Sequence, residues 1–165
     1  MTRAFSLGLL VFGLLVYVLL STETSDKNIA VVNAWSPVAP PTMSVHAGYF
    51  SLQNHSAGTL ELVAVSSPAY QSVEIHESLL ADGVASMRRL PSLAIKAHEN
   101  VQFESGGLHL MLRGPLSAKQ VGDNFPVLLE FTGGNKVEFV MQVSNTGGVD
   151  TDKSSPDMHH HHLGM

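Results

Sequence analysis

Short segments of alternating apolar and polar residues dominate the chain between Val31 and Val143. Successive side chains of a strand point to opposite faces, so this alternation predicts strands with one buried face. The segments richest in β-branched or aromatic residues are Ala47–Leu52, Leu60–Val65, Ser72–His76, Leu108–Arg113, Phe125–Phe131 and Lys136–Val143. Prolines and glycines separate them at intervals typical of a sandwich. The pattern therefore predicts one all-β domain without an internal repeat.

Both ends of the chain depart from this alternation. Residues 4–20 form an apolar run behind Arg3, long for a signal-peptide core and slightly short for a membrane-spanning helix. We expect a helix that acts as export signal or uncleaved anchor, with the anchor favoured because no A-x-A site follows. The positive Arg3 would stay in the cytoplasm and place the domain outside the inner membrane. The predicted organisation is residues 1–25 as signal peptide or anchor, 30–145 as the folded domain, and 146–165 as a disordered tail.

Composition excludes several classes of protein. With 44% hydrophobic and 14% charged residues, the chain is typical of a folded globular domain. Its net charge of -5 opposes binding to phosphates, so we expect no nucleic-acid partner. The sequence has no cysteine, which excludes disulfides, thiol catalysis, cysteine-based zinc sites and a lipidated cysteine.

Histidine and methionine residues carry the distinctive chemistry of the chain. His76, Met87, His109 and Met111 stand at the spacing H-x10-M-x21-H-x-M, which random placement would produce about once in a thousand such chains. Thioether sulfur is a soft ligand that suits Cu(I), and imidazole binds most late first-row metals. Methionine also survives where thiols are oxidised. We therefore predict a Cu(I) site made by these four side chains, outside the cytosol.

Strand geometry tests whether these side chains can meet. Within Leu108–Arg113 the leucines share one face, and the histidine and methionine share the other, which we expect to face outward beside an accessible rim. Asp82-Gly83 is typical of a two-residue type I′ hairpin. In that hairpin opposed residue numbers sum to 165, so Met87 lies diagonal to His76 on one face, at roughly 7 to 8 Å. A three-residue turn would move Met87 to the other face.

The spacing resembles the signature of the PCuAC family of bacterial periplasmic copper chaperones, over roughly residues 30–144. The local sequences Ser66–Pro68, Asp82-Gly83 and Gly106–Leu112 are also similar to the family. Some members carry a methionine directly after the first histidine, where this chain has Glu77. The resemblance implies a cupredoxin-like Greek-key β-sandwich or barrel. It also implies that the protein supplies Cu(I) to the CuA site of cytochrome c oxidase.

The sequence thus favours a periplasmic Cu(I) metallochaperone rather than an enzyme. Its expected partners are the copper ion, the CuA subunit of cytochrome c oxidase and other periplasmic copper proteins, with membrane contact only through residues 4–20. One alternative is a copper storage or resistance protein without a dedicated acceptor. The other is a copper redox enzyme, which is weakened because a blue-copper His2Cys site needs a cysteine.

The C-terminal tail offers a second set of metal ligands. Oxidised copper prefers imidazole nitrogen, so a histidine run after a flexible linker predicts a secondary Cu(II) site. The run comprises His159, His160, His161 and His162. Because it is preceded by Met158 and followed by Leu-Gly-Met, we interpret it as native rather than as a purification tag.

Other histidines, methionines and the tryptophan are expected to have structural roles. Met141 and Trp35 are predicted to fill the core. Met43 and His46 stand three residues apart in a proline-rich loop and are weaker metal candidates. The remaining histidines outside the tail, His55 and His98, lie in polar stretches and are expected to be solvated.

Overall fold

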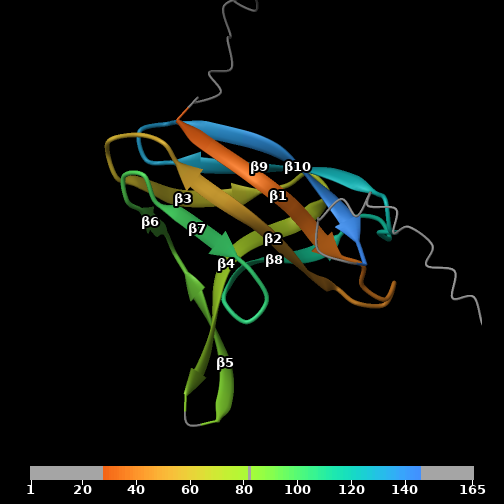
Figure 1. Cartoon of the computed structure of the whole chain (residues 1–165). Coiled ribbons are helices and arrows are strands. Elements are labelled where there is room, and N and C mark those ends of the chain that lie inside the picture. Colours follow the sequence, from red (N-terminus) through yellow and green to blue (C-terminus); the bar gives the residue numbers. More distant parts are fainter. Residues whose placement is uncertain (1–27, 82, 146–165) are drawn as a thin grey trace, which may run out of the picture.

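The computed structural model describes residues 28–81 and 83–145, and within these ranges the chain contains strands and turns but no helix (Figure 1). The strands are β1 (Ile29–Pro37), β2 (Val45–Asn54), β3 (Leu60–Ser66), β4 (Tyr70–Ala81), β5 (Val84–Leu90), β6 (Leu93–Ile95), β7 (Asn100–Phe103), β8 (Leu108–Pro115), β9 (Asn124–Phe131) and β10 (Lys136–Ser144). All six predicted segments lie within these strands, which confirms the all-β class. No helix in the described ranges could span a membrane. The expected N-terminal helix and the tail lie outside the described residues.

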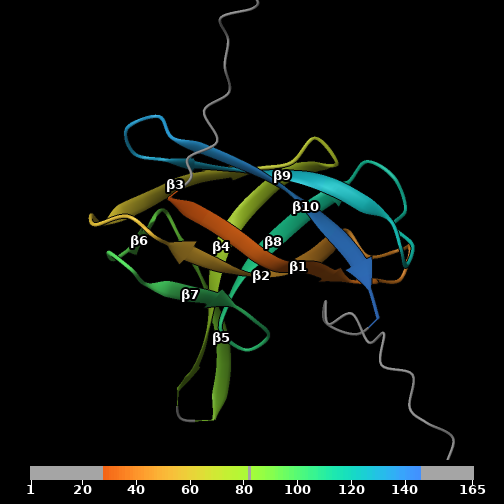
Figure 2. The same cartoon turned by 45° about the horizontal axis from the view of Figure 1, so that its top comes forward.

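The strands form one continuous sheet that curves into two layers. Their order is β5-β4-β8-β7-β2-β1-β10-β9-β3-β6, with β5 and β6 at the open edges. Figures 1 and 2 show β3, β9 and β10 in one layer and β2, β4 and β8 in the other. Strand β1 joins them, because it pairs antiparallel with β2 and parallel with β10. The arrangement is the predicted sandwich, built from a single curved sheet.

The hydrophobic core lies between the two layers. Aromatic rings meet across it: Tyr70 of β4 approaches Phe125 of β9, and Phe50 of β2 approaches Phe139 of β10, each pair with ring centres 5.2 Å apart. Met141 is fully buried there, as predicted. Strand β9 shows the expected alternation: every second residue is buried in this core, and the residues between them lie on the outer face of the sheet. Strand β5 contributes no buried residue.

Trp35 differs from the prediction of a core residue. It is half-buried and packs against the ring of Tyr49, with ring centres 5.1 Å apart. The pairing of β1 with β2 shifts register between Val32 and Trp35, where Asn33 has a φ of 56°. A bulge of this kind inserts an extra residue and changes which side chains face the core. The neighbouring Ser36, rather than Trp35, is consequently buried.

Strands β4 and β5 form a hairpin whose far end projects from the domain (Figure 1). Its register pairs Ala81 with Val84, so two residues connect the strands. Ser78 pairs with Met87, and all other opposed residues obey the same sum of 165. This confirms the predicted register and places Met87 on the same face as His76.

Candidate metal centre

The outer face of three adjacent strands brings the four predicted ligands together. His76 of β4 pairs directly with His109 of β8. Met111 lies two residues further along β8, and Met87 of β5 pairs with Ser78, two residues beyond His76. Since alternate residues of a strand share a face, all four side chains belong to one face of the sheet. The sandwich thus gathers residues that are up to 35 positions apart in the sequence, from His76 to Met111.

The two histidine rings lie close enough to share one metal ion. Their ring centres are 6.0 Å apart. An imidazole nitrogen binds a late first-row metal at about 2 Å and lies about 1.2 Å from its ring centre, so two rings on one ion have centres up to about 6.4 Å apart. The observed separation is within that limit.

Only one of the two ring nitrogens of His76 has a hydrogen-bond partner. Its Nε2 lies 2.9 Å from Oε2 of Glu74, and a carboxylate accepts, so Nε2–H is the donor. Its Nδ1 is buried and has no hydrogen-bond partner. Buried polar atoms are almost always satisfied, and an exception calls for an explanation such as an ion. In this position, a metal ligand is the simplest explanation.

His109 is oriented in a similar way by the backbone. Its Nδ1 donates to the carbonyl of Gly107 at 3.1 Å, which leaves the lone pair on Nε2. The same carbonyl accepts the backbone N–H of Ser78 at 3.0 Å. Gly106 adopts a φ of +82°, a conformation that favours glycine, so the Gly106-Gly107 pair lets the chain turn back onto the ligand strand. Metal-binding histidines commonly donate their second N–H in this manner.

The expectation of an outward, accessible pair on β8 is only partly correct. His76 and His109 are each only 7% exposed. Met111 is half-buried, whereas Met87 is 64% exposed. Solvent exposure therefore increases across the face opposite the core, from the two buried histidines to the exposed Met87.

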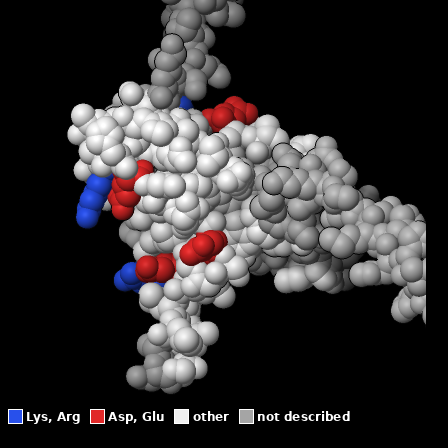
Figure 3. Space-filling model, in the orientation of Figure 1, with Lys and Arg blue, Asp and Glu red and all other residues white. Residues whose placement is uncertain are grey.

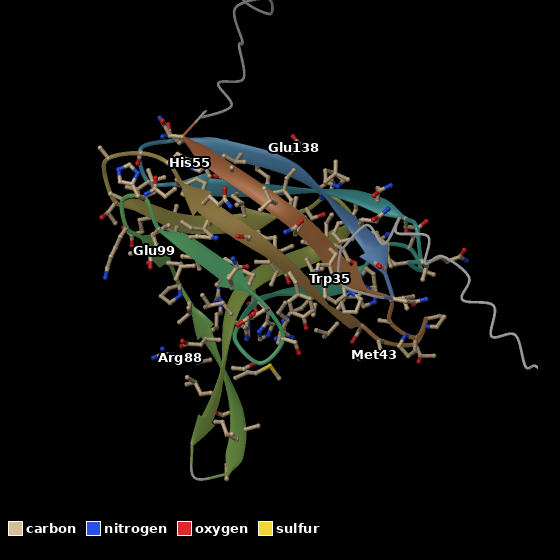
Figure 4. The ribbon with its side chains drawn as sticks, viewed as in Figure 1. Trp35, Met43, His55, Arg88, Glu99 and Glu138 are labelled. Carbon is tan, nitrogen blue, oxygen red and sulfur yellow. The ribbon has the colours of Figure 1, made fainter. Side chains whose placement is uncertain are left out.

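An open cleft of about 410 Å³ provides access to this face. Three of the four predicted ligands line it: Met87, His109 and Met111. Its opposite wall is the loop after β1, with Met43, which Figure 4 shows on the same side of the domain as Trp35. Charged side chains are sparse on the face seen in Figure 3. The cleft is lined mainly by apolar residues and leads to the His109 ring.

Met43 and His46 do not form a second site. His46 also lines the cleft, but its Nδ1 lies 3.0 Å from the hydroxyl of Tyr70 and its ring bonds to the backbone of Met43. Burial lowers the pKa of His46 and raises that of Tyr70 to about 12, so both groups are neutral near pH 7. This histidine is engaged as a structural residue. His55 and His98 are exposed, as expected.

The donor set fits a soft metal ion better than a hard one. No group of three or more His, Cys, Asp or Glu side chains suited to a metal occurs in residues 28–81 and 83–145. An ion held at the histidine pair would therefore need the thioethers to complete its coordination. Sulfur and imidazole together favour Cu(I). The histidines of the tail, His159–His162, lie outside the described residues, and their role stays a prediction.

Sequence reasoning missed two parts of this arrangement. Glu74 touches His76, and its carboxylate also meets the guanidinium groups of Arg89 and Arg113. The hydrogen bond from His76, aided by the two arginines, holds the pKa of Glu74 below its usual range. The E-x-H spacing on a strand was the signal for this contact. The role of the Gly107 carbonyl had no such signal, because any residue has a carbonyl.

Comparison of the sequence with known families and proteins gives a consistent result. The family described as "Putative lipoprotein LpqE-like" matches residues 29–143. A putative lipoprotein of Leifsonia xyli subsp. xyli is 27% identical over 142 residues, covering 84% of each chain. An uncharacterized protein of Rickettsia prowazekii is 30% identical over 123 residues, covering 70% of this chain and 68% of its own.

Solved structures share the fold. The copper-bound PCuAC domain from PmoF2 superposes with a TM-score of 0.61 at 18% identity, covering 72% of this chain and 94% of that domain. The Cu(I) form of DR1885 from Deinococcus radiodurans superposes with a TM-score of 0.57 at 22% identity, covering 76% of this chain and 85% of DR1885. The apo form of DR1885 superposes with a TM-score of 0.56 at 26% identity, covering 72% of this chain and 80% of DR1885. The sandwich described above is thus the fold of PCuAC domains.

Proposed function

This chain belongs to the LpqE-like family, and from that premise we propose that its folded domain is a copper chaperone that binds one Cu(I) through His76, Met87, His109 and Met111. Two solved structures with the same fold are a copper-bound form and a Cu(I) form. The observation that carries the proposal is the buried, unpartnered Nδ1 of His76 beside the His109 ring. A bound ion would satisfy that atom, and the thioethers would select the reduced metal.

The gradient of exposure across the site suits transfer of the ion between proteins. The histidines are buried and fixed by hydrogen bonds, while Met87 lies exposed on the projecting hairpin. An acceptor's thiolate would reach the ion from the cleft and displace this thioether first, followed by Met111. All four ligands are neutral, so the ion keeps its own charge and remains attractive to an anionic thiolate. We propose the CuA site of cytochrome c oxidase as the acceptor.

The proposed location is the periplasm, where copper enzymes of the cell envelope are loaded. The LpqE-like description and that of the Leifsonia relative both name lipoproteins. The present sequence contains no cysteine that could carry a thiol-linked lipid. We therefore assign membrane attachment to the apolar residues 4–20. The proposal gives the chain no catalytic step.

Removing the methionines tests the Cu(I) site. Competition with a chromogenic Cu(I) chelator should show weaker binding for Met87→Ala and Met111→Ala, with a smaller effect on Cu(II), because softness selects these ligands. Met43→Ala is the matched control, since Met43 lines the same cleft and is also exposed. Unchanged Cu(I) affinity in both ligand variants would refute the four-residue site.

An experiment in cells distinguishes copper delivery from copper storage. A chaperone predicts that loss of this protein under copper limitation reduces CuA-oxidase activity, that added copper restores it, and that copper tolerance changes little. A storage or resistance protein predicts normal oxidase activity together with marked copper sensitivity. Within the described residues, the proposed thioether site would hold one ion, and this supports delivery, because storage calls for several ions per chain.

A further inference from the structure

We propose that Glu74 is a positioning residue that makes Nδ1 of His76, rather than Nε2, the atom that binds copper. The inference rests on the proposed Cu(I) function and adds a role to a residue outside the four-ligand set. It follows from the hydrogen bonds around the His76 ring.

The contact with Glu74 occupies the Nε2 side of the ring. Nε2 of His76 lies 2.9 Å from Oε2 of Glu74, and the His76 side chain is 9% exposed. A neutral imidazole has one N–H and one lone pair. With the proton on Nε2, the lone pair is on Nδ1, which is the buried atom without a partner. The opposite tautomer would place a lone pair against a carboxylate and bury an unpaired Nδ1–H, so it is disfavoured on both sides of the ring.

Two arginines hold the carboxylate in place. Arg113 of β8 donates its Nε–H to Oε2 of Glu74 at 3.2 Å, and Nε of Arg89 on β5 lies 3.4 Å from Oε1. One arginine comes from each strand that flanks β4, so Glu74 is tied to all three strands that carry the candidate ligands. A fixed carboxylate fixes the ring that it contacts.

The two histidines would then bind through different atoms. His109 donates Nδ1–H to the Gly107 carbonyl and therefore offers Nε2. His76 donates Nε2–H to Glu74 and offers Nδ1. The two residues are directly opposed on β4 and β8, but their rings have different hydrogen-bond partners and therefore offer different nitrogens. The difference is set before the metal arrives.

The tautomer can be measured in the metal-free protein. Long-range ¹H–¹⁵N correlation spectra distinguish a protonated ring nitrogen from one with a lone pair. We expect protonated Nε2 and unprotonated Nδ1 for His76, and the reverse for His109. A proton on Nδ1 of His76 would overturn the inference.

Variants of Glu74 add a second measurement. In Glu74→Ala, His76 should shift towards a mixture of tautomers and Cu(I) affinity should fall roughly 10- to 100-fold, the usual effect of losing a partner of a metal-binding histidine. Glu74→Gln keeps an oxygen that can accept the Nε2–H and should lose less. Glu77→Ala is the matched control, because Glu77 pairs with Arg88 at 2.7 Å and points to the other face of β4. Figure 4 shows Arg88 on the hairpin, where that ion pair lies.

The outcomes distinguish this inference from the proposed function. If Glu74→Ala behaves like Glu77→Ala in both tautomer and affinity, Glu74 has no positioning role, although the Cu(I) site stands. If the wild-type protein binds no Cu(I), the chaperone proposal fails, and the metal-free spectrum still reports whether Glu74 sets the tautomer. Dispersed backbone amide spectra of each variant confirm that it is folded.

Discussion

Leu110 offers a quantitative test of how one strand serves both the core and the metal face. It lies between His109 and Met111 on β8, points to the opposite side, and is 0% exposed. Leu110→Ala removes three buried carbons, worth about 0.8 kcal/mol each, and leaves a partly collapsed cavity, so the free energy of unfolding should fall by about 3 kcal/mol.

This loss converts into a measurable change in melting temperature. Unfolding entropy is about 2.1 cal/mol/K per residue, or about 0.24 kcal/mol/K for the roughly 115 residues of the domain, which predicts a Tm lower by about 12 °C. Thermal unfolding followed by circular dichroism measures it. Leu80→Ala is the control, because Leu80 is 77% exposed on the hairpin and its loss should cost no more than about 0.5 kcal/mol.

Copper binding by the same variant separates packing from ligation. Where Leu110→Ala is still folded, its Cu(I) affinity should fall far less than that of Met111→Ala, since no ligand has been removed. A Tm lowered by less than about 4 °C, or lowered equally in Leu80→Ala, would refute the division of β8 into a core face and a site face.

Two further predictions concern other histidines. Truncation after Asp157 should lower the number of Cu(II) ions bound per chain. Cu(II) binding by the full chain should weaken as the pH falls through about 6.5, because protons compete with the metal for imidazole. Equal Cu(II) stoichiometry with and without the tail would show that the tail binds no copper. Burial lowers the pKa of His46, so as the pH falls the histidine is protonated in the unfolded chain before it is protonated in the folded protein. The contribution of neutral His46 to the free energy of unfolding is therefore complete above about pH 6.5 and should be lost as the pH falls towards the lowered pKa. The Tm, measured from about pH 8 to about pH 5.5, should therefore decrease, and less steeply in His46→Gln; parallel profiles would contradict this role.

The local pattern of the sequence was enough to predict six of the ten described strands and the hairpin register. Alternation in Leu108–Arg113 separates three leucines from a histidine and a methionine because the side-chain period of a strand is two. A two-residue turn after Ala81 leaves one register for the hairpin, and that register fixes Met87 on the face of His76. Both inferences depend only on neighbouring residues, which is why they were within reach.

The tertiary structure decided what lies around these residues. Alternation cannot tell whether the face opposite the core is covered, and here both histidines on that face are buried. It also cannot show that Glu74 contacts both His76 and two arginines from other strands, or that a bulge in β1 turns Trp35 away from the core. These features arise from contacts between segments distant in sequence, so only the folded sheet determines them.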